Sequence, residues 1–152
     1  KCGYTSGPFN IDLFIDNNNK PFINEIGPRN GGNFIPQVTK LATGVDMIEA
    51  SVEYCYDNTF EFNPTSSPDA RYVYSSYMIQ CKEDLNISGW TYKEKLKRHI
   101  VKETLFSDYI SSVSKFTNGS NALGNLILRF ESISEMNEMY KDINKQLVWS
   151  II

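Results

Sequence analysis

The stretch Phe22-Ile23-Asn24-Glu25-Ile26-Gly27-Pro28-Arg29-Asn30-Gly31-Gly32-Asn33 decides how this chain is interpreted. A carboxylate, Glu25, lies near the end of a short apolar run, and Arg29 follows four residues later. The glycine pair after the arginine can expose backbone N–H groups beside Asn33, a residue type that often begins a helix. A carboxylate, a guanidinium and exposed N–H groups together are typical of a site that handles metal-bound phosphate.

The residues around this stretch predict a β-hairpin. Residues 9–15 (FNIDLFI) and 21–26 (PFINEI) are rich in β-formers, and the Asp/Asn run at 16–20 predicts a tight turn. Such a turn would place Asp12 nearly opposite Glu25. Two carboxylates so close repel each other unless a cation lies between them or one holds a proton. Mg²⁺ suits this position, because it takes few protein carboxylates and completes its shell with water and phosphate oxygens.

Two helices and a linker are expected after the hairpin. The first helix would be capped by Asn33 and run to about residue 42, and the second would be capped by Asp46. Residues 58–69 contain two prolines among small polar residues, which predicts a linker. The expected division is therefore a unit at 1–57, the linker, and a second unit at 70–152.

The second unit is predicted to mix strands and helices. Residues 71–81 and 123–130 are rich in β-formers, and Ser132 and Glu135 have the spacing of a capping box that opens a helix. Residues 146–152 predict a closing strand. We therefore expect an α+β arrangement in this half of the chain.

Composition limits the function classes. The chain has 152 residues and a formal net charge of −3, which argues against a nucleic-acid partner. No apolar run is long enough to cross a bilayer, so no membrane partner is expected. The three cysteines show no C-x-x-C spacing, which favours a cytoplasmic location over a disulfide framework or a zinc site. The single histidine, His99, lies in a charged stretch, and no nucleophile–histidine constellation is evident.

Three segments resemble a known superfamily. Residues 7–12 (GPFNID), 24–33 (NEIGPRNGGN) and 43–46 (TGVD) resemble the end of an ATP-grasp domain, as in carbamoyl-phosphate synthase large chains and ATP-grasp amino-acid and peptide ligases. The resemblance implies the C-terminal part of an ATP-grasp fold. In that fold an antiparallel β-hairpin and helices would be followed by a small two-layer α/β sandwich.

The resemblance also implies roles for individual residues. Asp12 and Glu25 match metal ligands for Mg²⁺ (or Mn²⁺), and Arg29 matches the catalytic arginine that steadies the acyl-phosphate or the transferring phosphoryl group. Gly27 stands where the family has an asparagine that binds a second metal ion, so that ion would lack one side-chain oxygen here. The phosphates of ATP would be held by residues of the glycine pair and the helix start: Gly31, Gly32 and Asn33.

The implied reaction is ATP-driven ligation. A carboxylate would take the γ-phosphoryl group of ATP, and an amine would attack the resulting acyl-phosphate. The implied partners are ATP, a small carboxylate, a small amine and an N-terminal lobe of the same protein, with a homodimer as a possible assembly. Without that lobe we expect little or no activity. The alternative is a non-catalytic interaction or ligand-binding module, in which Asp12 and Glu25 are surface charges.

Overall fold

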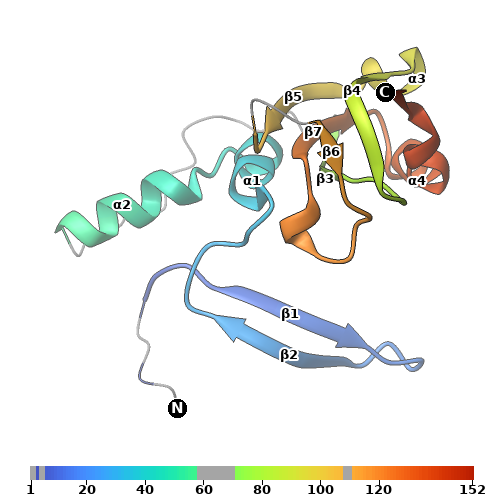
Figure 1. Ribbon diagram of the computed structural model, residues 1–152. Helices are drawn as coiled ribbons and strands as arrows, with labels where there is room; N and C mark the ends of the chain where they lie inside the picture. The colour runs from blue at the N-terminus through green and yellow to red at the C-terminus, as the bar shows by residue number, and fades with distance from the viewer. Residues whose placement is uncertain (1–2, 4–5, 58–70, 108–110) are drawn as a thin grey trace. The chain divides into compact units, whose positions relative to one another are not determined.

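A computed structural model describes residues 3, 6–57, 71–107 and 111–152. The chain divides into two compact units, Lys1–Pro68 and Asp69–Ile152. The expected linker at 58–69 lies outside the described residues, and the division falls at its end. Figure 1 shows the elements of both units along the chain.

The N-terminal unit begins with the predicted hairpin. Strands β1 (Asn10–Ile15) and β2 (Pro21–Gly27) are antiparallel and joined by a short turn (Figure 1). Asp16 Oδ1 accepts hydrogen bonds from the backbone N–H groups of Asn18 and Lys20, at 2.8 and 2.9 Å. Asn19 has a φ of 59°, a conformation that asparagine tolerates better than most residues. The turn chemistry expected from the Asp/Asn run is therefore confirmed.

The register of the hairpin changes once along its length. Near the turn Leu13 pairs with Ile23, whereas the next pair is Asp12 with Glu25, so Asn24 is an extra residue in β2. Such a one-residue bulge shifts the side-chain alternation of the strand that carries it. A regular ladder would have placed Asn24 opposite Asp12. The bulge instead places Glu25 there.

Helices α1 (Ile35–Thr43) and α2 (Met47–Asp57) follow the hairpin. The prediction that Asn33 caps α1 is wrong: Phe34 occupies the cap position, and no side chain there accepts a capping hydrogen bond. Asn33 and Phe34 both have left-handed backbone conformations, with φ of 51° and 61°, so the chain turns into the helix through its backbone.

The boundary between the two helices agrees with the sequence. Gly44 ends α1 with a φ of 77°, and its N–H bonds to the carbonyl of Lys40. Asp46 Oδ1 then accepts from the N–H groups of Ile48 and Glu49, both at 3.1 Å, which caps α2. This confirms the predicted start of the second helix.

In the described part of the C-terminal unit there are two three-stranded antiparallel sheets. The first has the order β3–β7–β5: Val73–Ile79, Gly124–Phe130 and Ile100–Leu105. The second has the order β6–β4–β8: Ser112–Val113, Leu85–Tyr92 and Leu147–Ile151. The helical elements are α3 (Glu94–Lys97), α4 (Ile133–Asp142) and the 3₁₀ turns η1 (Gly119–Asn121) and η2 (Ile143–Gln146).

The core of this unit lies between the first sheet and the helical segments. Its largest cluster joins Tyr77, Ile79, Leu126, Leu128 and Phe130 of this sheet with Leu96, Met139 and Ile143 of the helical segments and Leu147 at the start of β8. The predicted cap is also present, since Ser132 Oγ accepts from the Glu135 N–H at 3.1 Å. The Glu135 carboxylate accepts from the N–H of Glu131, the residue before the cap, at 2.8 Å. The α+β class is therefore confirmed. None of the described helices is long and apolar enough to cross a membrane.

Candidate functional site

The candidate site is one face of the hairpin. Asn10 pairs with Gly27, and Asp12 pairs with Glu25. Directly opposed residues of an antiparallel pair project to the same side of the sheet, so these four positions share a face. The structure thus pairs the two acidic residues that the sequence singled out.

Asn10 holds one of these carboxylates in place. Its Nδ2 donates a hydrogen bond to Asp12 Oδ1 at 3.1 Å. The amide fits there because Gly31 has no side chain: a Cβ on Gly31 would lie 3.0 Å from Asn10 Oδ1 and 3.0 Å from Ile35 Cδ1. Sequence analysis missed Asn10, although its place two residues before Asp12 already put both on one strand face.

Arg29 covers the end of the same face. Its side chain folds back over Gly27, where an added Cβ would lie 3.6 Å from Arg29 Cγ and 3.7 Å from Nε. The Arg29 N–H bonds to the Gly27 carbonyl and its Nη1 donates to the Asn30 carbonyl, both at 2.9 Å. The guanidinium is exposed and keeps further N–H donors for a ligand. The space left by Gly27 is therefore occupied by the arginine.

Asn30 anchors the loop that carries these groups. Its Nδ2 donates to Ser51 Oγ at 3.0 Å and to the Met47 carbonyl at 3.3 Å, which ties the loop to α2. Asn30 Oδ1 is buried without a hydrogen-bond partner among the described residues. Sequence analysis also missed this residue, and its place between Arg29 and the glycines was the only signal for it.

The helix that follows the predicted phosphate-binding residues has fewer free backbone N–H groups in its first turn than a typical helix start. The Ile35 N–H already bonds to the Gly32 carbonyl at 3.0 Å, and Pro36 has no N–H to offer. Gly32 borders open space, since a Cβ there would meet nothing within 4 Å. Gly32, ahead of α1, is therefore open on the side where a Cβ would project.

The donor set fits Mg²⁺. Asp12 and Glu25 are exposed, and neither forms an ion pair with a described residue. Within the described ranges no group of three or more His, Cys, Asp or Glu side chains could hold a metal ion. Two carboxylates are nevertheless enough for Mg²⁺, which is usually bound through one or two of them plus substrate phosphates and water. A metal that needs a complete protein cage would not suit this face.

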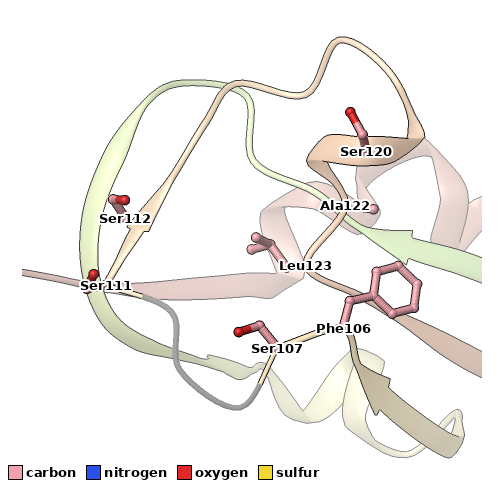
Figure 2. A pocket seen from close by; sticks show the side chains of 7 residues that line it. All are labelled: Phe106, Ser107, Ser111, Ser112, Ser120, Ala122 and Leu123. Atoms are coloured by element: carbon pink, nitrogen blue, oxygen red, sulfur yellow. The ribbon is translucent and has the colours of Figure 1, made fainter.

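The C-terminal unit contains hollows that sequence analysis did not predict. One, of about 380 Å³, is lined by Ser107, Ser111, Ser112 and Ser120 together with apolar side chains (Figure 2). Its described lining residues carry no charge. Ser120 Oγ donates to Asn118 Oδ1, so that hydroxyl also serves the η1 turn. This hollow offers hydroxyl groups but no acid, base or metal ligand.

Comparison with known proteins identifies the fold. No protein-family model matches the sequence, and no curated protein matches it. Among solved structures, L-amino acid ligase from Bacillus licheniformis matches with a TM-score of 0.76 at 16% identity over 99% of this chain. Phosphoribosylglycinamide synthetase from Anaerococcus prevotii matches with a TM-score of 0.70 at 17% identity over 95%. N5-carboxyaminoimidazole ribonucleotide synthetase from Thermotoga maritima gives 0.59 at 14% identity over 95%.

All three similar structures are ATP-grasp enzymes. This chain has the fold of the C-terminal part of ATP-grasp enzymes, as its hairpin and loop motifs suggested. The chain spans about 37% of the length of each of the three.

Proposed function

We propose that this chain is part of an ATP-dependent carboxylate–amine ligase that acts through an acyl-phosphate. The observation that carries the proposal is the cross-strand pair of Asp12 and Glu25, with Arg29 folded over the neighbouring Gly27 on the same face. The fold supports it, since the similar structures include an L-amino acid ligase and two synthetases. A structural role alone would not require two unpaired carboxylates directly opposite each other.

Each residue has a definite task in this proposal. Asp12 and Glu25 would hold Mg²⁺, which when bound neutralises phosphate charge. Asn10 donates to one oxygen of Asp12 and so leaves the other oxygen to face the ligand. Gly31 and Gly32 would present backbone N–H groups to phosphate oxygens.

Arg29 would act on the transferring group. Its planar fork can bond two oxygens of an acyl-phosphate while the backbone bond to Gly27 keeps the residue in place. Catalysis of this kind consists of positioning and of stabilising developing negative charge, and needs no protein nucleophile. The carboxylate substrate supplies the attacking oxygen, and the amine displaces phosphate from the acyl-phosphate.

We further propose that the 152-residue chain by itself neither binds Mg·ATP with micromolar affinity nor turns it over. Its length is about 37% of that of the similar enzymes, and the apolar side chains of its hairpin are exposed on both faces. Isothermal titration of the isolated chain with Mg·ATP would test this part. Micromolar binding would contradict it.

The ligase proposal is tested in the complete protein that contains this chain. Hydroxylamine traps an acyl-phosphate as a hydroxamate, so trapping should depend on ATP and on a carboxylic acid substrate. Asp12→Asn and Glu25→Gln should each lower trapping by about 100-fold or more, because each removes a ligand-facing charge. Glu53→Gln, an exposed glutamate on α2, is the matched control. No ATP-dependent trapping in the unmodified protein would favour the non-catalytic module, and unchanged trapping in both site variants would remove Asp12 and Glu25 from the proposed site.

A further inference from the structure

A second hollow in the C-terminal unit has a charged and aromatic lining. It has a volume of about 350 Å³ and lies between β4 and β5. Trp90, Tyr92, Glu103 and Leu105 form its larger walls, and small residues, Ser88 and Gly89 among them, leave the space open. The volume is within the range of small-molecule sites.

The hollow lies where two sheets present edges to each other. From Ile87 to Tyr92, β4 pairs with β8 on one side, while β6 pairs only with Leu85 and Asn86. Strand β5 is an outer strand of the other sheet, paired with β7. Strands β4 and β5 are therefore not paired with each other, and the hollow lies outside both sheet ladders.

A chain of hydrogen bonds fixes the polar wall. Trp90 Nε1 donates to the Tyr92 hydroxyl at 2.8 Å, and the hydroxyl donates to Glu103 Oε1 at 2.5 Å. Burial, and secondarily the hydrogen bond to Glu103, raises the pKa of Tyr92 above its usual range, so the phenol keeps its proton. The carboxylate is thus held in one position by a donor that does not neutralise it.

Glu103 has no cationic partner among the residues that the structure describes, since no Lys, Arg or His there forms an ion pair with it. A fixed carboxylate beside an indole and a phenol repels anions and attracts cations, since aromatic rings also favour a positive charge. We propose that this hollow binds a small organic cation through an ammonium or guanidinium group.

The competing explanation is a purely structural strut between β4 and β5. Glu103→Gln separates the two, because a glutamine oxygen can still accept the Tyr92 hydrogen bond while the charge is lost. Tyr92→Phe does the reverse, removing the strut and keeping the carboxylate. All residues involved belong to the C-terminal unit, so the proposal is independent of the function proposed for Asp12 and Glu25 on the hairpin.

The test uses the 152-residue chain and n-propylammonium, with 1-propanol as a neutral probe of similar shape. In a ¹H–¹⁵N NMR titration, n-propylammonium should shift the indole N–H of Trp90 saturably, and 1-propanol should not. Glu103→Gln should weaken the amine at least about tenfold, and Tyr92→Phe by less. Glu138→Gln, an exposed glutamate on α4, should leave the affinity unchanged.

Three results would overturn the proposal: no saturable binding of the amine, equal binding of amine and alcohol, or full affinity in folded Glu103→Gln. The amine–alcohol comparison is made on the unmodified chain. It therefore decides the matter even if a variant fails to fold.

Discussion

Strands β2 and β7 have the same length of seven residues but very different surroundings. In β2, Phe22, Ile23 and Ile26 are 48%, 62% and 49% exposed, whereas Leu126 and Leu128 of β7 are fully buried. The difference lies in their neighbours, since β7 is the central strand of a sheet backed by helical segments and β2 has one partner strand. Composition makes a strand able to be buried, and the rest of the protein decides whether it is.

The hairpin therefore offers apolar surface that the described residues of its own unit do not cover. Its exposed large apolar side chains are Ile11, Leu13, Phe14, Ile15, Phe22, Ile23 and Ile26. A two-stranded hairpin is marginally stable in water without further packing. This agrees with the proposal that the hairpin works within a larger protein.

Hydrogen exchange should show the largest contrast between the two strands. In the isolated chain we expect protection factors in β7 to exceed those in β2 by about 100-fold or more, because β7 opens only with its core. NMR-detected exchange of individual amides would measure this. Equal protection in both strands would mean that the hairpin is stabilised by something other than its own ladder.

Truncation of matched leucines should sharpen the contrast. Leu128→Ala should lower the free energy of unfolding by about 3 kcal/mol, because it opens a cavity in the core. Leu13→Ala, at a side chain 53% exposed, should change it by less than about 0.5 kcal/mol. Urea denaturation followed by circular dichroism gives both values. A large loss from Leu13→Ala would contradict the comparison.

Some positions beside the exposed hairpin should still be sensitive to substitution. Gly31→Ala should displace the Asn10 side chain and thereby loosen Asp12, lowering Mn²⁺ affinity of the complete protein by about tenfold. Gly32→Ala is the matched control, since its Cβ would meet nothing within 4 Å. Electron paramagnetic resonance of free Mn²⁺ measures the affinity. Equal affinity in the two variants would remove Asn10 from the site.

The smallest effect is expected at the start of α2. Asp46 caps this helix and bonds to Lys40 Nζ at 2.5 Å. The Lys40 hydrogen bond, followed by the bond from the Glu49 N–H, lowers the pKa of Asp46 below its ordinary value of 3.8. A lowered acid pKa stabilises the folded state above pH 3.8, and this contribution is lost as the pH falls through the folded value.

Asp46→Ala should thus lower the stability of α2 by about 1 kcal/mol at neutral pH. At pH 2, where Asp46 is protonated, the same substitution should have no effect. Lys40→Ala removes the ion pair alone and should cost less. The NMR chemical shifts of α2 report its helix content, and following them from pH 7 to pH 2 would measure the effect of each substitution. An equal cost at both ends of the pH range would contradict the role of the ionised carboxylate.

Local chemistry made the hairpin and the second helix predictable. The Asp16 turn, the Gly44 helix end and the Asp46 cap each depend on a residue type whose hydrogen bonding or backbone freedom acts within a few positions. The pairing of Asp12 with Glu25 was predicted from strand alternation and a tight turn, without the bulge that produces it. Alternation alone would have paired Asp12 with Asn24, and no sequence signal marks the bulge.

Other features depended on contacts between distant residues. Asn33 was taken as a cap because asparagine favours caps, but asparagine also tolerates positive φ, and the backbone uses that property here. No strand is predicted at residues 99–106, yet β5 forms at Ile100–Leu105 because β7 offers a paired edge. The aromatic and carboxylate hollow needs Trp90 and Glu103 from different sheets, which spacing along the chain does not show.

Asn24 has a consequence for how such hairpins can change in evolution. Deleting this single residue would restore a regular ladder in which Glu25 still pairs with Asp12. A regular ladder that kept Asn24 would instead pair Asn24 with Asp12 and turn Glu25 to the other side of the hairpin. The pairing of the two acids therefore survives the loss of Asn24 but not the loss of the bulge while Asn24 remains, and a relative with one residue fewer at this point would keep the pair.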